Sequence, residues 1–164
     1  MRCKTGIVIV SLITIWLFSV LGQAPKATAA SPAVEAKSQV AAAEKKWLNA
    51  FYRLDAAVLE TSESSDFTFV APPAMVTRDQ QLKLVQQRFA TAGTPRTPTT
   101  YEIGNQTIRV YGDVGLVSDV CTVLGGSDSR IISPGRYWQT EVWRKEGSTW
   151  KLVHVHISSV EHGM

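Results

Sequence analysis

The sequence has little cysteine, and a mature chain cannot form an internal disulfide. Its 164 residues contain Cys3 and Cys121, and we expect Cys3 to be removed with an N-terminal leader. About 135 residues remain, enough for a domain that is held together by a hydrophobic core alone. Cys121 lies between Val120 and Val123 in an apolar stretch, where it is either a buried, inert thiol or a reactive one.

The sequence also lacks a lasting excess of positive charge. The formal net charge of +3 comes from 17 basic and 14 acidic residues. Three of the basic residues, Arg2, Lys4 and Lys26, precede Ala30, and no acidic residue does, so loss of the leader leaves 14 of each. A neutral chain has no electrostatic footprint for nucleic acid, and we expect no nucleic acid as a partner.

Motifs that bind cofactors or activate nucleophiles are missing as well. The sequence contains no Gly-rich phosphate loop, no Cys-x-x-Cys pair and no Ser-His-Asp order. We therefore expect no cofactor.

The first thirty residues have the pattern of a secretory signal peptide. Met1–Lys4 is basic, Gly6–Leu21 is apolar except for Ser and Thr, and Ala27–Ala29 is a small-x-small site. This order predicts cleavage at or just after Ala29.

The predicted cleavage defines the organisation of the chain. We expect a signal peptide at 1–29, a short lead-in at 30–39 and a single domain at 40–160, in a secreted or periplasmic protein that has left the membrane. The alternative is an uncleaved anchor, although the apolar run is shorter than the roughly 20 residues that span a bilayer.

Helical patterns come first in the mature chain. A long helix is expected to begin at Ser31-Pro32. Its apolar residues recur at helical spacing; they are Val40, Trp47, Phe51, Leu54 and Val58. After a short strand at Asp66–Val70, Thr77 and Gln80 have the spacing of a capping box. The second helix that they begin is expected to bury Leu82, Val85 and Phe89.

The second half of the chain has the pattern of strands. Turn residues separate four predicted strands, Thr100–Tyr111, Val114–Leu124, Gly135–Lys145 and Thr149–Val160. These strands are longer than usual, and long strands must twist and curl. We predict an α+β fold in which a cone-shaped, curved antiparallel sheet wraps around the N-terminal helices and encloses a pocket.

The C-terminal stretch resembles a known superfamily. Val142-Trp143, a charged turn with Gly147, then Trp150 and finally Val153–Ser158 (Val-His-Val-His-Ile-Ser) are similar to the end of nuclear transport factor 2-like domains. The closest likeness is to SnoaL-like domains and to the association domain of calcium/calmodulin-dependent protein kinase II, and it covers Val40 to Ser158.

The resemblance implies a cystatin-like α+β barrel that is usually dimeric through its sheets. It does not imply one activity, because the superfamily includes isomerases, cyclases, dehydratases, ligand-binding domains and assembly modules.

The resemblance also assigns places to four residues. The base of ketosteroid isomerases corresponds to Ala71, and their helical Tyr corresponds to Trp47. Neither side chain can take over that role, so the usual steroid-isomerase chemistry is not expected. The pocket arginines of the kinase association domain correspond to Glu141 and Ile157, which implies that both positions face into the cone.

Strand alternation extends this assignment to further pocket residues. Tyr137 and Gln139 share a face with Glu141. We predict a largely apolar pocket with Glu141 as its deep carboxylate; the ligand-binding residues are Trp47, Tyr137, Gln139, Ser118 and Thr122. Burial would raise the pKa of Glu141 and suit it to general acid/base catalysis. Alternatively, Glu141 pairs with an arginine or stays near the wet mouth.

His154, His156 and Trp138 are predicted to lie on the outer face of the sheet. Two histidines at i and i+2 can bind zinc only with a third ligand, and none is assured, so we predict no metal. We interpret both histidines and Trp138 as interface or structural residues, with Asp119 as a partner of the histidines. A stacking platform for a ligand is the alternative role for the tryptophans.

Three functions follow from these features. The first is the binding of a small, largely apolar molecule in the cone. The second is an isomerase, dehydratase or cyclase activity with Glu141 as the acid/base group. The third is assembly of a homodimer or a larger homo-oligomer through the outer sheet face.

Overall fold

A computed structural model describes residues 31–91, 97–126 and 132–160 of the chain. The predicted signal peptide at 1–29 lies outside the described residues. Among the described residues, no helix is long and apolar enough to cross a membrane.

Three helices are present where the sequence predicts two. They are α1 (Pro32–Arg53), α2 (Ala56–Ser62) and α3 (Arg78–Thr91). Leu54 adopts a left-handed conformation with a φ of 59° and ends α1, and the side chain of Asp55 accepts a hydrogen bond from the Val58 amide at the start of α2. The predicted single helix is therefore two helices with a sharp joint.

The strands form one sheet. Their bounds are β1 (Glu63–Ala71), β2 (Ala74–Thr77), β3 (Thr100–Tyr111), β4 (Val114–Gly125), β5 (Gly135–Glu146) and β6 (Thr149–Ser159). The four long strands end within one residue of the prediction. The sequence analysis missed β2, because Pro72-Pro73 reads as the end of a strand whereas it joins β1 to β2 in a tight turn.

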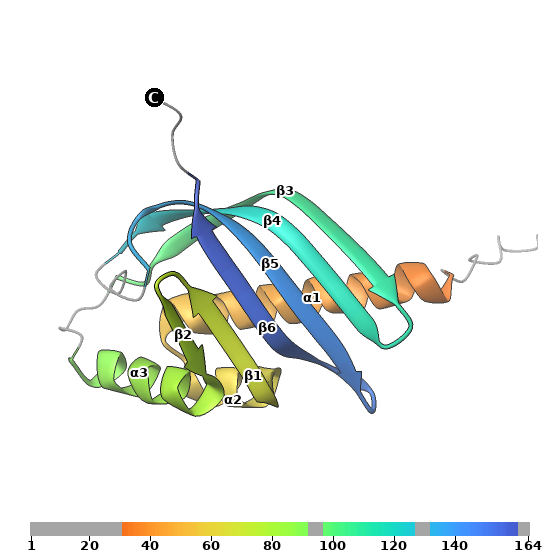
Figure 1. Ribbon diagram of the computed structural model, residues 1–164, viewed down its shortest axis with the longest axis horizontal. Helices are drawn as coiled ribbons and strands as arrows, with labels where there is room; N and C mark the ends of the chain where they lie inside the picture. Colours follow the sequence, from red (N-terminus) through yellow and green to blue (C-terminus); the bar gives the residue numbers. More distant parts are fainter. Residues whose placement is uncertain (1–30, 92–96, 127–131, 161–164) are drawn as a thin grey trace, which may run out of the picture.

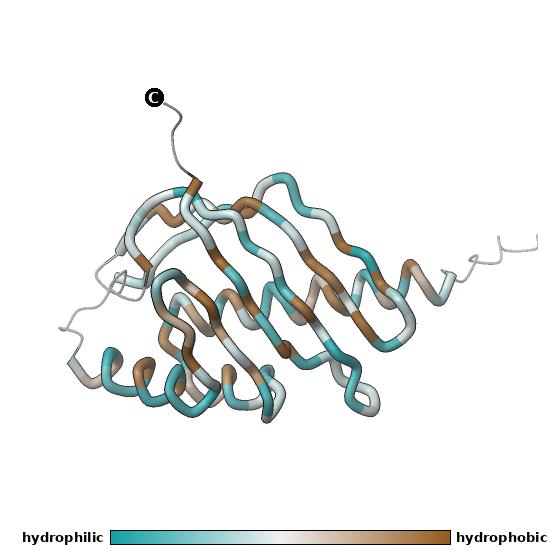
Figure 2. The backbone as a smooth tube through the Cα atoms, viewed as in Figure 1, coloured by the Kyte–Doolittle hydropathy of each residue, from teal (hydrophilic) through white to brown (hydrophobic). Residues whose placement is uncertain are grey.

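The sheet is curved and unclosed, as the predicted α+β fold requires. Its strand order is β2-β1-β6-β5-β4-β3, and all neighbours are antiparallel except β1 and β6. Helix α1 runs behind the sheet across its strands, whereas α2 and α3 lie beside β1 and β2 at one end (Figure 1). Hydrophobic and hydrophilic residues alternate along much of the sheet (Figure 2).

Two of the irregularities in strand pairing decide which face the side chains near the site take. In β3, three steps from Gly104 to Thr107 oppose two steps of β4, and Asn105 has a φ of 52°. In β6, the pairing with β5 shifts next to Val153, so that Leu152 lies in the core together with Val155. Leu152 and His154 therefore lie on opposite faces of the sheet.

The core lies between α1 and the inner face of the sheet. Trp47, Phe51, Phe67 and Trp143 are buried there. The rings of Trp47 and Phe51 are stacked with centroids 5.1 Å apart, and those of Trp47 and Phe67 lie 6.4 Å apart. Large aromatic side chains thus occupy much of the space in which the sequence analysis expects an open pocket.

Helix α3 buries less than predicted. Val85 is buried and Leu82 is partly buried, but Phe89 is 54% exposed and the polar Gln81 is buried instead. The Gln80 side chain accepts a hydrogen bond from the Thr77 amide, which is the half of the predicted capping box that Gln80 supplies.

Candidate functional site

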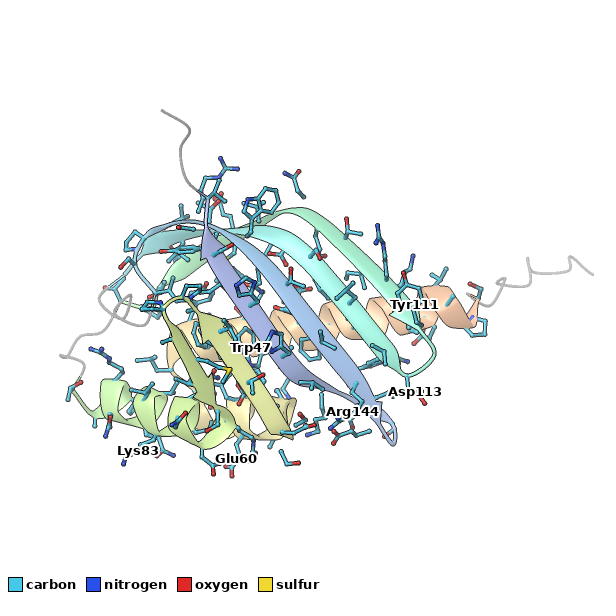
Figure 3. All side chains as sticks on the ribbon, in the orientation of Figure 1. Trp47, Glu60, Lys83, Tyr111, Asp113 and Arg144 are labelled. Atoms are coloured by element: carbon cyan, nitrogen blue, oxygen red, sulfur yellow. The ribbon has the colours of Figure 1, made fainter. Side chains whose placement is uncertain are left out.

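Trp47 belongs to the core and does not line an open pocket. It lies near the middle of the molecule (Figure 3). Its indole nitrogen donates a hydrogen bond to Oε1 of the buried Glu63 over 2.8 Å, and Gln81 donates to the same oxygen over 2.6 Å. Burial raises the pKa of Glu63 to about 7, against the lowering effect of these two bonds. This arrangement joins α1, α3 and β1 and has a structural role.

Glu141 is buried as predicted but has no access to a ligand. Its exposed fraction is 0%. Its carboxylate accepts hydrogen bonds from the side chains of Gln139 and Trp143, the latter over 2.7 Å. Burial raises its pKa to about 8, with repulsion from Asp119 adding to the shift. Among the described residues, no arginine pairs with it.

Tyr137 and Glu141 are not brought together. The Tyr137 hydroxyl donates a hydrogen bond to the Ser133 carbonyl over 2.8 Å. Its side chain lines a small hollow of about 180 Å³ with Ala71 and Ile157 at one end of the sheet. Gln139 is buried and serves the Glu141 carboxylate. The predicted pocket with Glu141 as its floor therefore has no counterpart in these contacts.

Ser118 and Thr122, predicted for the pocket, and Asp119, predicted for the outer face, each lie on the other face of the sheet. Ser118 and Thr122 lie on the outer face, because Ser118 is paired with Thr140 and thereby aligned with His156. Asp119 lies on the inner face, because it is paired with the inward-facing Gln139. Both faces of β4 carry apolar as well as polar side chains, so hydropathy alone does not separate them.

The histidines lie on the outer face as predicted. Nδ1 of His154 is 2.8 Å from the Thr68 hydroxyl, and His156 is exposed. Trp138 lies on the same face and is 55% exposed. Asp119 is not their partner. In the part of the chain that the structure describes, no group of His, Cys, Asp and Glu side chains is arranged to hold a metal ion.

A cluster of three buried carboxyl groups is the chemically most unusual feature of the inner face. Glu44 comes from α1, Asp119 from β4 and Glu141 from β5, and their exposed fractions are 2%, 1% and 0%. Buried carboxyl groups that face one another cannot all be ionised, because burial and mutual repulsion both disfavour the charged form.

Among the three groups, Glu44 most strongly favours its protonated form. Burial raises its pKa to about 9, and repulsion from Glu141 and Asp119 adds to the shift. Burial also raises the pKa of Asp119, to about 6. At neutral pH Glu44 therefore favours its neutral, protonated form.

Glu44 lies at the floor of a groove between α1 and the edge strand β3. The groove has a volume of about 400 Å³. Its lining consists of apolar and polar side chains from both elements; they are Ala41, Lys45, Leu48, Tyr101, Ile103 and Gln106. Gln106 donates hydrogen bonds to both Glu44 oxygens, over 2.9 and 2.8 Å. A mainly apolar cleft with a few fixed polar groups is typical of a small-molecule site.

The shift in strand pairing within β3, a β-bulge, places Gln106 on the face that meets Glu44. Before it, Tyr101 and Ile103 face the helix; after it, the face changes to even-numbered residues, so that Gln106 reaches Glu44. Tyr101 is held in place by a 3.2 Å hydrogen bond from its hydroxyl to the Asn49 side chain. Two other hollows, of about 460 and 280 Å³, are not lined by any of the three clustered carboxyl groups.

Glu44 was missed in the sequence although a signal for it is there. It lies four residues after Val40 and three before Trp47, inside the apolar face of α1. A charged residue within such a face is either paired or functional. Asp119 has the same signal, since it lies between the inward-facing Val117 and Cys121.

The fold is shared with solved structures of NTF2-like (nuclear transport factor 2-like) proteins. A protein described as a candidate dehydratase of the NTF2-like family, from Streptomyces avermitilis, is 19% identical with a TM-score of 0.66, over 79% of this chain and 99% of that one. The CaMKII hub of S. rosetta is 20% identical with a TM-score of 0.60, over 81% and 100%.

A third solved structure, an NTF2-like protein from Cytophaga hutchinsonii, is 19% identical with a TM-score of 0.62, over 74% of this chain and 95% of that one. These likenesses concern the fold. No curated protein sequence matches the chain at a significant level. The model of the SnoaL-like domain matches residues 40–161, so the chain belongs to the SnoaL-like domain family.

Proposed function

We propose that this chain is an exported small-molecule-binding domain whose ligand lies in the groove between α1 and β3. The observation that carries the proposal is the position of Glu44, a buried carboxyl group at the floor of a groove of about 400 Å³. Binding in the interior of the cone is less well supported, because Trp47, Phe51, Phe67 and Trp143 lie there.

The walls of the groove suit a ligand with an apolar body. Leu48 and Ile103 offer aliphatic surface, and Ala41 leaves room between them. The polar atoms converge on one point, where Gln106 meets Glu44. Such a site gives affinity through apolar contact and orientation through a few hydrogen bonds.

Filling the groove tests this proposal. Ala41→Phe places a ring between α1 and β3 and should abolish binding of any small molecule that the protein retains or selects from a fragment collection, measured by ligand-observed NMR. Ala57→Phe is the matched control, because Ala57 is exposed on α2 and outside the groove. Equal binding by both variants would place the ligand elsewhere.

Export is supported by the leader sequence alone. The basic start, the apolar run Gly6–Leu21 and the small residues Ala27–Ala29 support cleavage. Mass determination of the protein purified from its own host should give an N-terminus at Ala30 or Ser31. A chain that still begins at Met1 would contradict both the cleavage and the proposed release from the membrane.

Acid/base catalysis in the same groove is a second candidate, and the raised pKa of Glu44 favours it. Glu44 then takes the role that the sequence analysis gives to Glu141, because Glu141 has no exposed surface. For a dehydration or isomerisation found with this protein, Glu44→Gln should lower kcat at least about a hundredfold. Glu141→Gln should change it only through stability, and the reverse result would exclude Glu44.

Self-association is the third proposal, and the exposed Trp138 on the outer sheet face supports it. The CaMKII hub among the similar structures points the same way, at the level of the fold. We propose a homodimer or larger homo-oligomer that uses this face and leaves the groove open.

A further inference from the structure

The buried carboxyl cluster lacks a positive partner in the part of the chain that the structure describes. The ion pairs there join Arg144 to Asp66 and to Glu146, all partly exposed at the surface. Lys45 lines the groove, but its side chain is exposed and forms no ion pair with Glu44. Buried carboxylates without a cationic partner are costly unless they are protonated, and a bound cation would remove this cost.

Asp119 gives independent support. Its exposed fraction is 1%, and among the described residues neither of its carboxylate oxygens receives a hydrogen bond from an N–H group or a hydroxyl group. Since buried polar atoms are nearly always paired, an unpaired buried carboxylate directed at Glu44 points to a missing donor.

The two sides of the groove decide what kind of donor fits. A hydrated metal ion would need several oxygen ligands at once, and no such set is arranged among the described residues. The aliphatic side chains of Leu48 and Ile103 border the polar floor. They favour a ligand that combines a charged N–H group with an apolar body.

We infer that the groove binds an organic cation, in which an ammonium or guanidinium group rests on Glu44 above Asp119 and a small apolar body lies against Leu48 and Ile103. This inference rests on the groove being the ligand site, as proposed above. The cation takes the place of the proton on Glu44 and gives the cluster the positive charge that it lacks. A guanidinium group suits the site well, because its N–H groups can donate to more than one carboxylate oxygen.

The test compares three probes that share a benzyl or phenyl body and differ in charge. Benzylguanidinium, benzyl alcohol and benzoate are titrated into the mature domain at pH 7 and followed by isothermal titration calorimetry. Benzylguanidinium should bind at least about tenfold more tightly than benzyl alcohol, since a hydrogen bond to a charged group is worth more than a neutral one. Benzoate should bind most weakly, because Asp119 repels it.

Variants test whether the preference for benzylguanidinium depends on the buried carboxyl groups. Glu44→Gln should reduce the advantage of benzylguanidinium over benzyl alcohol at least about fivefold. Asp119→Asn should act in the same direction and serves as the second variant if the first fails to fold. Glu102→Gln is the matched control, because Glu102 is exposed on the outer face of β3, whose inner face lines the groove, and it should leave the preference intact.

The outcomes separate the two proposals. Benzyl alcohol binding in the groove as tightly as benzylguanidinium would overturn the cation assignment and leave the groove as the ligand site. Benzoate binding most tightly would also overturn it and would point to Lys45. Failure of all three probes to bind, together with no effect of Ala41→Phe on other ligands, would overturn both proposals.

Discussion

Glu44 is a titratable side chain within the buried, apolar face of α1. Its neighbours along the helix face, Val40 and Trp47, are buried core residues, and it is as buried as they are. A glutamate in that position weakens the fold unless it stays protonated or meets a positive partner. Gln106 donates a hydrogen bond to it and it lies at the floor of a groove, and both features fit the proposed ligand site.

The pH dependence of stability should reveal this cost. The pKa of Glu44 is raised from about 4.5 in the unfolded chain to about 9 in the folded one, so the folded state holds more protons between these values. Stability is then greatest below pH 4.5 for this group and falls as the pH rises towards 9. Asp119 and Glu141 act in the same direction up to about pH 6 and 8.

Glu44→Gln should remove the largest part of this fall. At pH 8.5 the variant should melt about 3 °C or more above the parent, and near pH 5 the two should differ much less. Thermal unfolding by circular dichroism across this range measures both, with Glu102→Gln as the control for loss of a surface charge. An unchanged slope in Glu44→Gln would mean that Glu44 is ionised in the folded protein.

At the scale of helices and strands, the sequence alone predicts the bounds of the elements better than the faces of their side chains. The long strands were predictable within one residue, since turn residues mark their ends and long apolar stretches mark their bodies. The faces of the side chains were not, because a bulge such as that at Asn105 or Val153 shifts the alternation without a mark in hydropathy. The face that Ser118 and Asp119 take had to come from the pairing of strands.

The contact between α1 and β4 is an element-level feature that can be tested. A side chain at Gly115 would place its Cβ 3.0 Å from a Val40 methyl group and 3.3 Å from Cβ of Trp143. Gly115→Ala should therefore lower the free energy of unfolding by about 1–3 kcal/mol, measured by urea denaturation.

Gly104→Ala is the matched control for this change. Gly104 lies on the neighbouring strand, and its nearest neighbour to an added Cβ is the Val120 carbonyl oxygen at 3.9 Å. Its stability should change by less than about 0.5 kcal/mol. Equal losses in the two variants would mean that α1 does not approach β4 as closely as described.

At the scale of the whole molecule, the two faces of the sheet carry different features. The inner face carries α1, the aromatic core and the groove, whereas the outer face carries Trp138 and the histidines. The proposed association through the outer face would leave the groove open, because α1 and β3 line the groove on the opposite side. The sequence does not separate the two faces, because apolar side chains of β4 point to both.

Association through the outer face predicts a specific effect of Trp138. Trp138→Ala removes the largest exposed apolar side chain of that face and should shift the protein towards monomer in sedimentation velocity. Leu84→Ala, on the exposed side of α3, should leave the distribution unchanged. A parent protein that sediments as a monomer at high concentration would contradict the assembly proposal.

The most direct test of the groove as the ligand site is a map of backbone amide chemical shifts during a titration with benzylguanidinium. The largest changes should fall on the stretch of α1 from Ala41 to Leu48 and on β3 from Tyr101 to Gln106. Changes concentrated instead around Tyr137 and Ala71, or on the outer face around Trp138, would contradict the account and place the ligand outside the groove.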